Sequence, residues 1–239
     1  MSRVRCLRLC LATAGVGVAV AAVALAQDTV PIELHVDARV VPNKAGTATH
    51  PQAVRIESHA YVKIPEGYDP PLVDTVEVWF PKGGLYNGHK YPKCSQNVLA
   101  RRGPTACPKG SIMGKGRGKA TADTVFTYPR IAVVNGGRDT VFFYTVLTNP
   151  ARVRAPVVGK LTKPGGRWSY KLHTRIPRVL QVVAGIPIVL RELHIKAGDP
   201  RKDWIATTSC PRDKRWRYHV LITFTTGQTK TYDDSVRCR

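Results

Sequence analysis

Six consecutive residues near the middle of the chain alternate glycine with basic side chains: Gly114-Lys115-Gly116-Arg117-Gly118-Lys119. Glycine lets backbone amides approach an anion, and Lys or Arg neutralises it, so this composition suggests phosphate binding. The spacing does not match a P-loop, which needs four residues between its first glycine and a Gly-Lys pair followed by Ser or Thr. The dinucleotide-binding glycine pattern is missing as well. We therefore expect a flexible basic loop rather than a nucleotide site.

The basic side chains of this loop and of the turn before it form the one candidate ligand-binding set in the sequence. They are Lys109, Lys115, Arg117 and Lys119. A mobile group of cations attracts polyanions through Coulomb steering and counterion release. The sequence thus predicts an anion patch without specifying the anion.

Histidine is the next residue type that could carry chemistry. None of the histidines forms a His-Glu-x-x-His pair, and none lies beside a cysteine at a spacing typical of metal ligands. Histidines that are exposed or hydrogen-bonded within strands are the common case. The seven are His35, His50, His59, His89, His173, His194 and His219. The sequence predicts no metal site and no cofactor.

Serine and paired carboxylates offer no stronger candidate. Ser95, Ser111 and Ser209 each lie beside or near a cysteine in a turn context, where serine forms local hydrogen bonds. Asp233 and Asp234 are adjacent, and neighbouring residues of a strand point to opposite faces, so these carboxylates do not converge. We assign no catalytic residue. Acid pairs that meet only in the folded chain stay open.

Residues 1–26 have the features of a secretory signal peptide. Three arginines lie in the first eight residues, and no charge follows from Leu9 to Leu25. The stretch ends on Ala24-Leu25-Ala26, a small-residue pattern that predicts cleavage before Gln27. A retained membrane anchor is the alternative. Its helix would need about 20 apolar residues, and this run is slightly shorter and rich in Ala, Val and Gly.

Four cysteines remain after the signal peptide: Cys94, Cys107, Cys210 and Cys238. Four cysteines allow three pairings, and sequence alone does not choose among them. Closing a short loop costs the chain least entropy, which favours Cys94–Cys107 and Cys210–Cys238. Separate buried thiols are the alternative, although an exported chain favours disulfides. A zinc site is disfavoured because no two of these cysteines stand two to four residues apart.

The chain is strongly basic, with 37 Lys and Arg against 16 Asp and Glu and a formal net charge of +21. Removing the three arginines of the signal peptide leaves +21 − 3 = +18. Outside a cell, such a surface meets wall polymers, anionic lipid head groups and extracellular DNA, and charge alone does not distinguish these partners. The alternative is that the charge reflects a compositional preference for arginine and has no role in binding.

Strand patterns recur along most of the mature chain. Apolar residues alternate with polar ones from Ile32 to Val40, and again from Trp216 to Phe224. Helical periodicity is not found over a useful length. We therefore predict an all-β fold, an antiparallel β-sandwich of roughly eight to eleven strands, as one domain over residues 27–239. A long loop rich in Gly, Pro and basic residues is expected over residues 82–119.

Several segments together resemble a group of uncharacterised exported proteins of actinobacteria. They are Leu85-Tyr86-Asn87, Tyr91-Pro92-Lys93-Cys94-Ser95, Cys107-Pro108-Lys109-Gly110-Ser111 with Gly114, Gly116 and Ala120, the stretch from Gly185-Ile186-Pro187 to Leu193, and the end from Tyr218 to Cys238. The similarity covers about Val30 to Cys238. It implies a secreted or wall-associated β-rich domain with Cys94–Cys107 as a loop bridge, and it transfers no site. This chain is more basic over Gly114–Lys119 than the group tends to be.

These observations favour an exported, non-enzymatic domain that is structural or binds an anionic envelope component. The partners expected are an anionic envelope polymer or lipid head groups. No specific nucleic-acid partner is expected, and the membrane is contacted only through an uncleaved signal. Two other functions stay open: a secreted hydrolase of a polysaccharide or ester, and a carrier of lipids or other hydrophobic molecules between two sheets.

Overall fold

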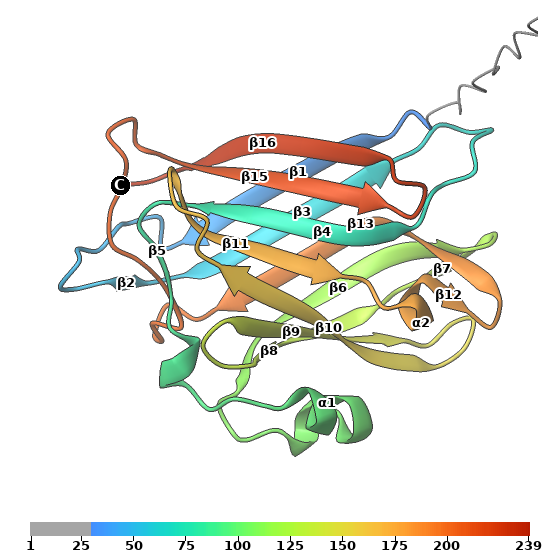
Figure 1. Cartoon of the computed structure of the whole chain (residues 1–239), viewed down its shortest axis with the longest axis horizontal. Coiled ribbons are helices and arrows are strands. Elements are labelled where there is room, and N and C mark those ends of the chain that lie inside the picture. Colours follow the sequence, from blue (N-terminus) through green and yellow to red (C-terminus); the bar gives the residue numbers. More distant parts are fainter. Residues whose placement is uncertain (1–29) are drawn as a thin grey trace, which may run out of the picture.

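A computed structural model describes residues 30–239 (Figure 1). The signal peptide predicted over residues 1–26 lies outside the described residues. The fold is all-β and antiparallel, as the sequence predicted. One sheet of thirteen strands contains most of the chain. Its main path runs β1 (Glu33–Val41), β3 (Arg55–Lys63), β13 (Ile186–Gly198), β6 (Ile112–Ala122), β8 (Arg130–Asn135), β9 (Thr140–Leu147), β10 (Val153–Thr162), β11 (Trp168–Arg175), β4 (Val73–Pro81), β15 (Arg215–Phe224) and β16 (Thr229–Arg237).

Shorter elements complete the described chain. In the main sheet, β7 (Val125–Thr127) pairs with β6, and β12 (Val182–Val183) pairs with β13. A second sheet orders β2 (Gln52–Ala53), β14 (Ile205–Thr207) and β5 (Gly84–Tyr86). The helices are α1 (Gln96–Arg102) and α2 (Arg178–Gln181), with 3-10 turns at η1 (Gly88–Lys90) and η2 (Pro104–Ala106). None of the helices in residues 30–239 has the length and apolar character needed to cross a membrane.

The main sheet curls until its two edge strands meet, so the sandwich is a nearly closed barrel. Figure 1 shows β16 beside β1, although the two strands are not paired in the sheet order. The Tyr218 hydroxyl on β15 donates a hydrogen bond to the Val36 carbonyl on β1 at 2.5 Å. The contact between β1 and β16 places the two edges against each other, and an edge covered in this way is less open to pairing with another chain.

The alternation read from the sequence explains which side chains fill the interior. On β1, Leu34 and Val36 are buried while Glu33 and Asp37 are exposed. On β15 every second residue is buried, from Trp216 to Phe224. Side chains of successive strand residues point to opposite faces, so β1 and β15 each supply one apolar row to the core and one more polar row to the outer surface.

The segment 82–119 is more ordered than the loop predicted from its glycines and prolines. It contains β5, both 3-10 turns, α1 and the first part of β6. The α1 helix packs its buried Leu99 against Phe142 and Tyr144 of β9. Residues 87–111 therefore cover the outer face of β8, β9 and β10, which explains why β9 is buried on both faces. Figure 1 shows α1 outside the sheet on that side.

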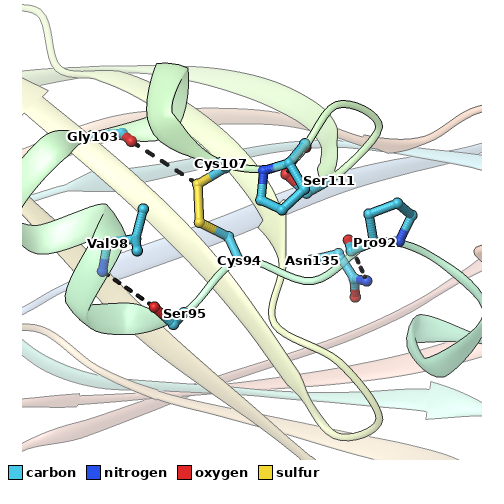
Figure 2. The surroundings of a disulfide bond; sticks show 9 residues. Pro92, Cys94, Ser95, Val98, Gly103, Cys107, Ser111 and Asn135 are labelled. Carbon is cyan, nitrogen blue, oxygen red and sulfur yellow. Dashed lines mark hydrogen bonds between the residues drawn. A yellow bond between two sulfur atoms is a disulfide. The ribbon is translucent and has the colours of Figure 1, made fainter.

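A disulfide and side-chain hydrogen bonds hold this covering segment in place. The disulfide Cys94–Cys107, predicted from its short loop, joins the residues on either side of α1, with Cα atoms 5.3 Å apart. Figure 2 shows the buried Asn135 nearby, whose side-chain amide donates to the Pro92 carbonyl at 3.1 Å. The Ser95 hydroxyl caps α1 by accepting from the Val98 amide. The second predicted disulfide, Cys210–Cys238, is also formed.

Candidate ligand-binding face

The outer surface of β3, β13 and β6 collects polar side chains that are far apart in the sequence. Residues directly opposite each other on antiparallel strands project to the same face. His59 on β3 is opposite His194 on β13, which is opposite Arg117 on β6. Arg117 is in turn opposite Arg130 on β8. One row across four strands therefore begins with two imidazoles and ends with two guanidinium groups.

A second row runs beside the first and adds a carboxylate. Tyr61 on β3 is opposite Glu192 on β13, and Glu192 is opposite Lys119 on β6. The Glu192 Oε2 atom is 3.9 Å from His59 Nε2 and 3.8 Å from His194 Nε2. Each strand places its members two residues apart, on the same side of the sheet. We call His59, Glu192 and His194 the histidine–glutamate cluster.

The two imidazole rings of the cluster stack on each other. Their centroids are 3.9 Å apart and their planes differ by 9°. Tyr61 is also near His59, with ring centroids 5.7 Å apart and planes tilted by 43°. Because of this packing, His59 Nε2 is buried, and it has no hydrogen-bond partner among the described residues. A buried ring nitrogen without a partner is uncommon in proteins.

Burial and nearby charges favour the uncharged form of His194. Burial lowers the pKa of His194 below its ordinary value because it removes water from the charged form, and the nearby His59 and Arg117 lower it further. Glu192 acts in the opposite direction but does not reverse the shift. A neutral imidazole keeps a lone pair on one ring nitrogen, which is the form that binds metal ions.

Three of the four residues predicted to bind anions lie together on this face. Lys115, Arg117 and Lys119 alternate along β6 and point outward. They belong to a regular strand, so the expected flexible loop is wrong for residues 112–119. Lys109 is exposed in the turn before β6, outside this row. We call Lys115, Arg117, Lys119 and the added Arg130 the basic row.

The glycines between these cations explain why a sequence so rich in glycine forms a strand. Gly116 faces inward, where an added Cβ would lie 2.5 Å from Ile195 Cδ1 and 2.6 Å from the His194 carbonyl oxygen. Neighbouring strands approach β6 too closely for a side chain at this position. Glycine in a strand often marks such a close approach or a bend at a barrel corner.

Within residues 30–239, no carboxylate lies at ion-pair distance from the four cations of the basic row. Lys196, opposite Lys115 on β13, differs because it pairs with Glu57 at 3.3 Å. Four unpaired cations on one face create a positive surface potential that favours an anionic partner.

Aromatic side chains border the basic row at β7 and the turn after it. Phe126 is 47% exposed and Tyr128 is 62% exposed. The Lys119 ammonium lies 4.4 Å from the centroid of the Phe126 ring, a cation–π contact. The face thus combines cations with exposed aromatic rings, and Lys119 and Phe126 belong to the hairpin of β6 and β7.

The other residues considered from the sequence have local roles. Ser95 caps α1, and the buried Ser111 hydroxyl donates to the Pro108 carbonyl at 2.7 Å. Asp233 contacts His219 on β15, with 2.9 Å between a carboxylate oxygen and the ring Nδ1. Its neighbour Asp234 is opposite Tyr218 instead. These two carboxylates therefore do not converge on one site.

Two hollows indent the surface elsewhere. One lies between the Cys94 region and the start of β9, where Lys93 and Lys160 line it. The other lies near the end of β3 and contains Glu33, Lys63 and Arg191. Neither hollow brings together two carboxylates, or a serine beside a histidine. The hydrolase hypothesis gains no support from them.

Comparisons with protein-family models, with curated proteins and with solved structures give no match. The candidate site therefore rests on this chain's own geometry. Sequence reasoning missed the histidine–glutamate cluster because His59 is far along the chain from Glu192 and His194. The only local signal was the spacing of Glu192 and His194, which puts both residues on one face of a strand.

Proposed function

We propose that the protein is exported and binds an anionic polymer of the cell envelope, without catalysis, through the basic row of β6 and β8. The observation that carries this proposal is the outward alignment of Lys115, Arg117 and Lys119 with Arg130, free of ion pairs within residues 30–239. Two disulfides suggest an oxidising, extracytoplasmic environment. The predicted signal peptide over residues 1–26 accounts for delivery to it.

The spacing of the basic row suits a chain of charges better than a single small anion. Alternate residues of a strand lie about 6.5 to 7 Å apart, and neighbouring strands are separated by about 4.8 Å. Lys115, Arg117 and Lys119 therefore offer successive cations along β6, and Arg130 adds one beside them. A polymer with a phosphate or carboxylate on each repeating unit contacts several of these groups at once, and its many weak contacts add.

The shape of the face also favours a polymer. Small-molecule sites are usually concave and enclose most of their ligand. The basic row lies on the outer side of a sheet, and neither of the two hollows includes its residues. An extended ligand lying across the strands needs no enclosing pocket. Aromatic Phe126 and Tyr128 at the end of the row provide apolar contact area for sugar rings or for the polymer backbone.

Co-sedimentation with purified cell walls tests the proposal. The full chain, expressed with its own N-terminal segment and purified in processed form, is mixed with walls at low and at high salt. We expect binding at low salt that weakens steeply as salt rises, because each contact releases counterions. The variant Lys115→Gln/Arg117→Gln/Lys119→Gln should bind at least about tenfold more weakly.

A matched control removes the same number of charges from other strands. Arg212→Gln/Lys214→Gln/Arg237→Gln changes exposed residues before β15 and at the end of β16. This variant should bind walls almost as well as the native protein if the basic row is the site. Equal loss in both variants would mean that binding follows net charge alone. Absence of binding at low salt would refute the proposal.

Anionic lipid is a second candidate target, favoured by the exposed apolar side chains near the basic row. Val125 is 54% exposed at the start of β7, close to Phe126 and Tyr128. Apolar and aromatic groups beside cations are typical of proteins that bind a membrane surface. Binding to vesicles with and without phosphatidylglycerol shows whether the protein recognises anionic lipid. Phe126→Ser should reduce vesicle binding much more than wall binding if lipid is the partner.

The export part of the proposal has its own test. N-terminal sequencing of the protein recovered from the producing cells should begin at Gln27. A sequence that begins at Met1 or Ser2 would show that the segment is retained, as expected for an anchor.

A further inference from the structure

We propose that His59, Glu192 and His194 bind one divalent transition-metal ion on the outer face of β3 and β13. The three side chains offer two imidazole nitrogens and one carboxylate oxygen, and these ligand atoms all lie within 4.8 Å of one another. Two histidines and one carboxylate form a common ligand set for zinc and for other first-row metal ions. The site differs in residues and chemistry from the basic row, and it does not depend on the proposed function.

The distances fit a metal ion of this size. The two nitrogen-to-oxygen distances in the cluster are 3.9 and 3.8 Å. A point equidistant from three atoms with such separations lies about 2.2 to 2.5 Å from each, and zinc bonds to nitrogen and oxygen measure about 2.0 to 2.2 Å. Small side-chain adjustments therefore bring all three groups into a coordination sphere.

Ring rotation provides that adjustment. The lone pairs of ring nitrogens lie in the ring plane, and the two planes are 9° apart, so the rings must turn for both nitrogens to converge on one ion. His59 and His194 each expose about a third of the side chain, 36% and 34%. Rotation about the side-chain bonds therefore has room on the solvent side. The strands underneath are fixed by their pairing, so the ligands remain within reach of each other.

The unpartnered nitrogen of His59 is an independent observation. His59 Nε2 is buried and lacks a hydrogen bond within the described residues, which is unfavourable for a polar atom. A bound cation satisfies this nitrogen directly. Neither imidazole nitrogen is within hydrogen-bond distance of the Glu192 carboxylate, from which they are separated by 3.9 and 3.8 Å. One cation placed between them can contact all three groups.

Charged residues next to the histidine–glutamate cluster affect its affinity for a cation. Arg117, opposite His194, works against cation binding, whereas Asp37, opposite His59 on β1, works in favour of it. Three protein ligands leave at least one coordination position open. Because Arg117 is opposite His194, a phosphate or carboxylate that completes the coordination sphere would have a cation on the neighbouring strand.

Isothermal titration calorimetry with Zn²⁺ tests the site. The full chain is used in its processed form and without a histidine tag. We expect saturable binding of one ion per chain. The variants His59→Ala, Glu192→Gln and His194→Ala should each weaken it at least about tenfold, since even partners outside the coordination sphere contribute 10- to 100-fold. His35→Ala is the matched control. This residue lies on the same face and stacks on Tyr61, outside the cluster, and the change should leave affinity within about twofold.

A measurement without substitutions removes any dependence on the folding of variants. Nitrogen-15 spectra of the histidine rings should show large Zn²⁺-dependent shifts for His59 and His194. His173, which contacts Glu77, and His219, which contacts Asp233, should not respond. Co²⁺ should give visible absorption bands in the native protein that His194→Ala lacks. Binding of neither ion, or binding equal in all variants with unchanged ring signals, would overturn the proposal.

Discussion

Asn135 Oδ1 accepts a hydrogen bond from the indole Nε1 of Trp204 at 3.1 Å, and both side chains are almost completely buried. The same oxygen accepts from the Tyr86 hydroxyl at 3.0 Å. The Asn135 amide nitrogen donates to three carbonyl oxygens of the covering segment, those of Gly88, Tyr91 and Pro92. One side chain at the end of β8 therefore links the small sheet, the main sheet and residues 88–92.

Replacing Asn135 should destabilise the whole domain. Asn135→Ala removes the acceptor of three donors, which are Trp204 Nε1, the Tyr86 hydroxyl and the Gly137 amide, and the Tyr86 hydroxyl alone keeps a second partner, the Thr140 carbonyl. The variant also removes the donor to three carbonyl groups, and each buried group left unsatisfied costs about 1 to 3 kcal/mol. These losses are not additive, so we expect the free energy of unfolding to fall by about 3 to 5 kcal/mol. Urea unfolding followed by tryptophan fluorescence measures it. Asn97→Ala, at an exposed position of α1, should change stability by less than about 0.5 kcal/mol.

Removing the Cys94–Cys107 disulfide should loosen the covering segment more than the barrel. The bridge closes a loop with a sequence separation of 13, for which the chain-entropy contribution is about 3 kcal/mol. In Cys94→Ser/Cys107→Ser, hydrogen exchange should accelerate most at the amides of α1 around Leu99. Amides in the centre of β15 should keep most of their protection. Equal acceleration in both regions would show that the segment and the barrel unfold as one unit.

Stability should fall in acid partly through Asp203. Hydrogen bonds from Lys90 at 2.6 Å and Tyr91 at 2.7 Å lower the pKa of the Asp203 carboxyl, against a smaller opposing effect of burial. Burial, together with donation to Asp203, raises the pKa of Tyr91 to about 12. A carboxyl whose pKa is lower in the folded state stabilises the fold fully above its unfolded pKa of about 3.9, and the contribution is lost as pH falls through the folded pKa.

Asp203→Asn tests this contribution. We expect the variant to be less stable than the native protein by about 1 to 2 kcal/mol at pH 7, because a third of the Asp203 side chain is exposed and solvent screens the charge. The difference should narrow below about pH 4 as the native carboxyl takes up a proton. Thermal unfolding of the native protein and of Asp203→Asn from pH 7 to pH 2.5 measures the difference in stability and its change with pH. Asp69→Asn, at an exposed acid outside any ion pair of the described chain, is the control.

Local patterns were sufficient to predict the fold class and the disulfides. Alternation in residues 32–40 and 216–224 identified β1 and β15, since one buried face leaves a period of two in the sequence. The two disulfides join cysteines that are close in the chain, so loop entropy selected the observed pairing. Neither inference needed knowledge of which strands are neighbours in the sheet.

Features that depend on strand neighbours were not predictable. The glycines in residues 114–118 suggested a loop. The structure shows instead that β6 needs glycine at position 116 because β13 and β8 lie too close for a side chain there, and this crowding cannot be read from the sequence. The histidine–glutamate cluster depends on the register between β3 and β13, which places His59 opposite His194. The register between strands that are distant in the chain cannot be predicted from a single sequence. Knowledge that residues 114–119 form a strand would have aligned Lys115, Arg117 and Lys119 on one face.

A methyl group at Gly116 should therefore disturb both the barrel and the candidate site. The added Cβ of Gly116→Ala meets the His194 carbonyl oxygen, a backbone atom that moves only with β13, as well as the end of the Ile195 side chain. Overpacking of this kind costs about 1 to 3 kcal/mol. Because His194 belongs to the histidine–glutamate cluster, the strand shift should also weaken Zn²⁺ binding in the titration described above.

Gly84→Ala is the matched control for this substitution. Gly84 lies in β5, its backbone is not in the left-handed region, and an added Cβ would have ordinary contacts, the nearest at 3.4 Å to the Pro81 carbonyl oxygen. Alanine also restricts the unfolded chain, so this change should leave stability within about 1 kcal/mol and Zn²⁺ affinity unaltered. Urea unfolding and zinc titration of both variants measure the contrast. Equal stability of Gly116→Ala and the native protein would mean that β6 and β13 tolerate wider spacing, and the physical reason given for the glycine–cation alternation would then be wrong.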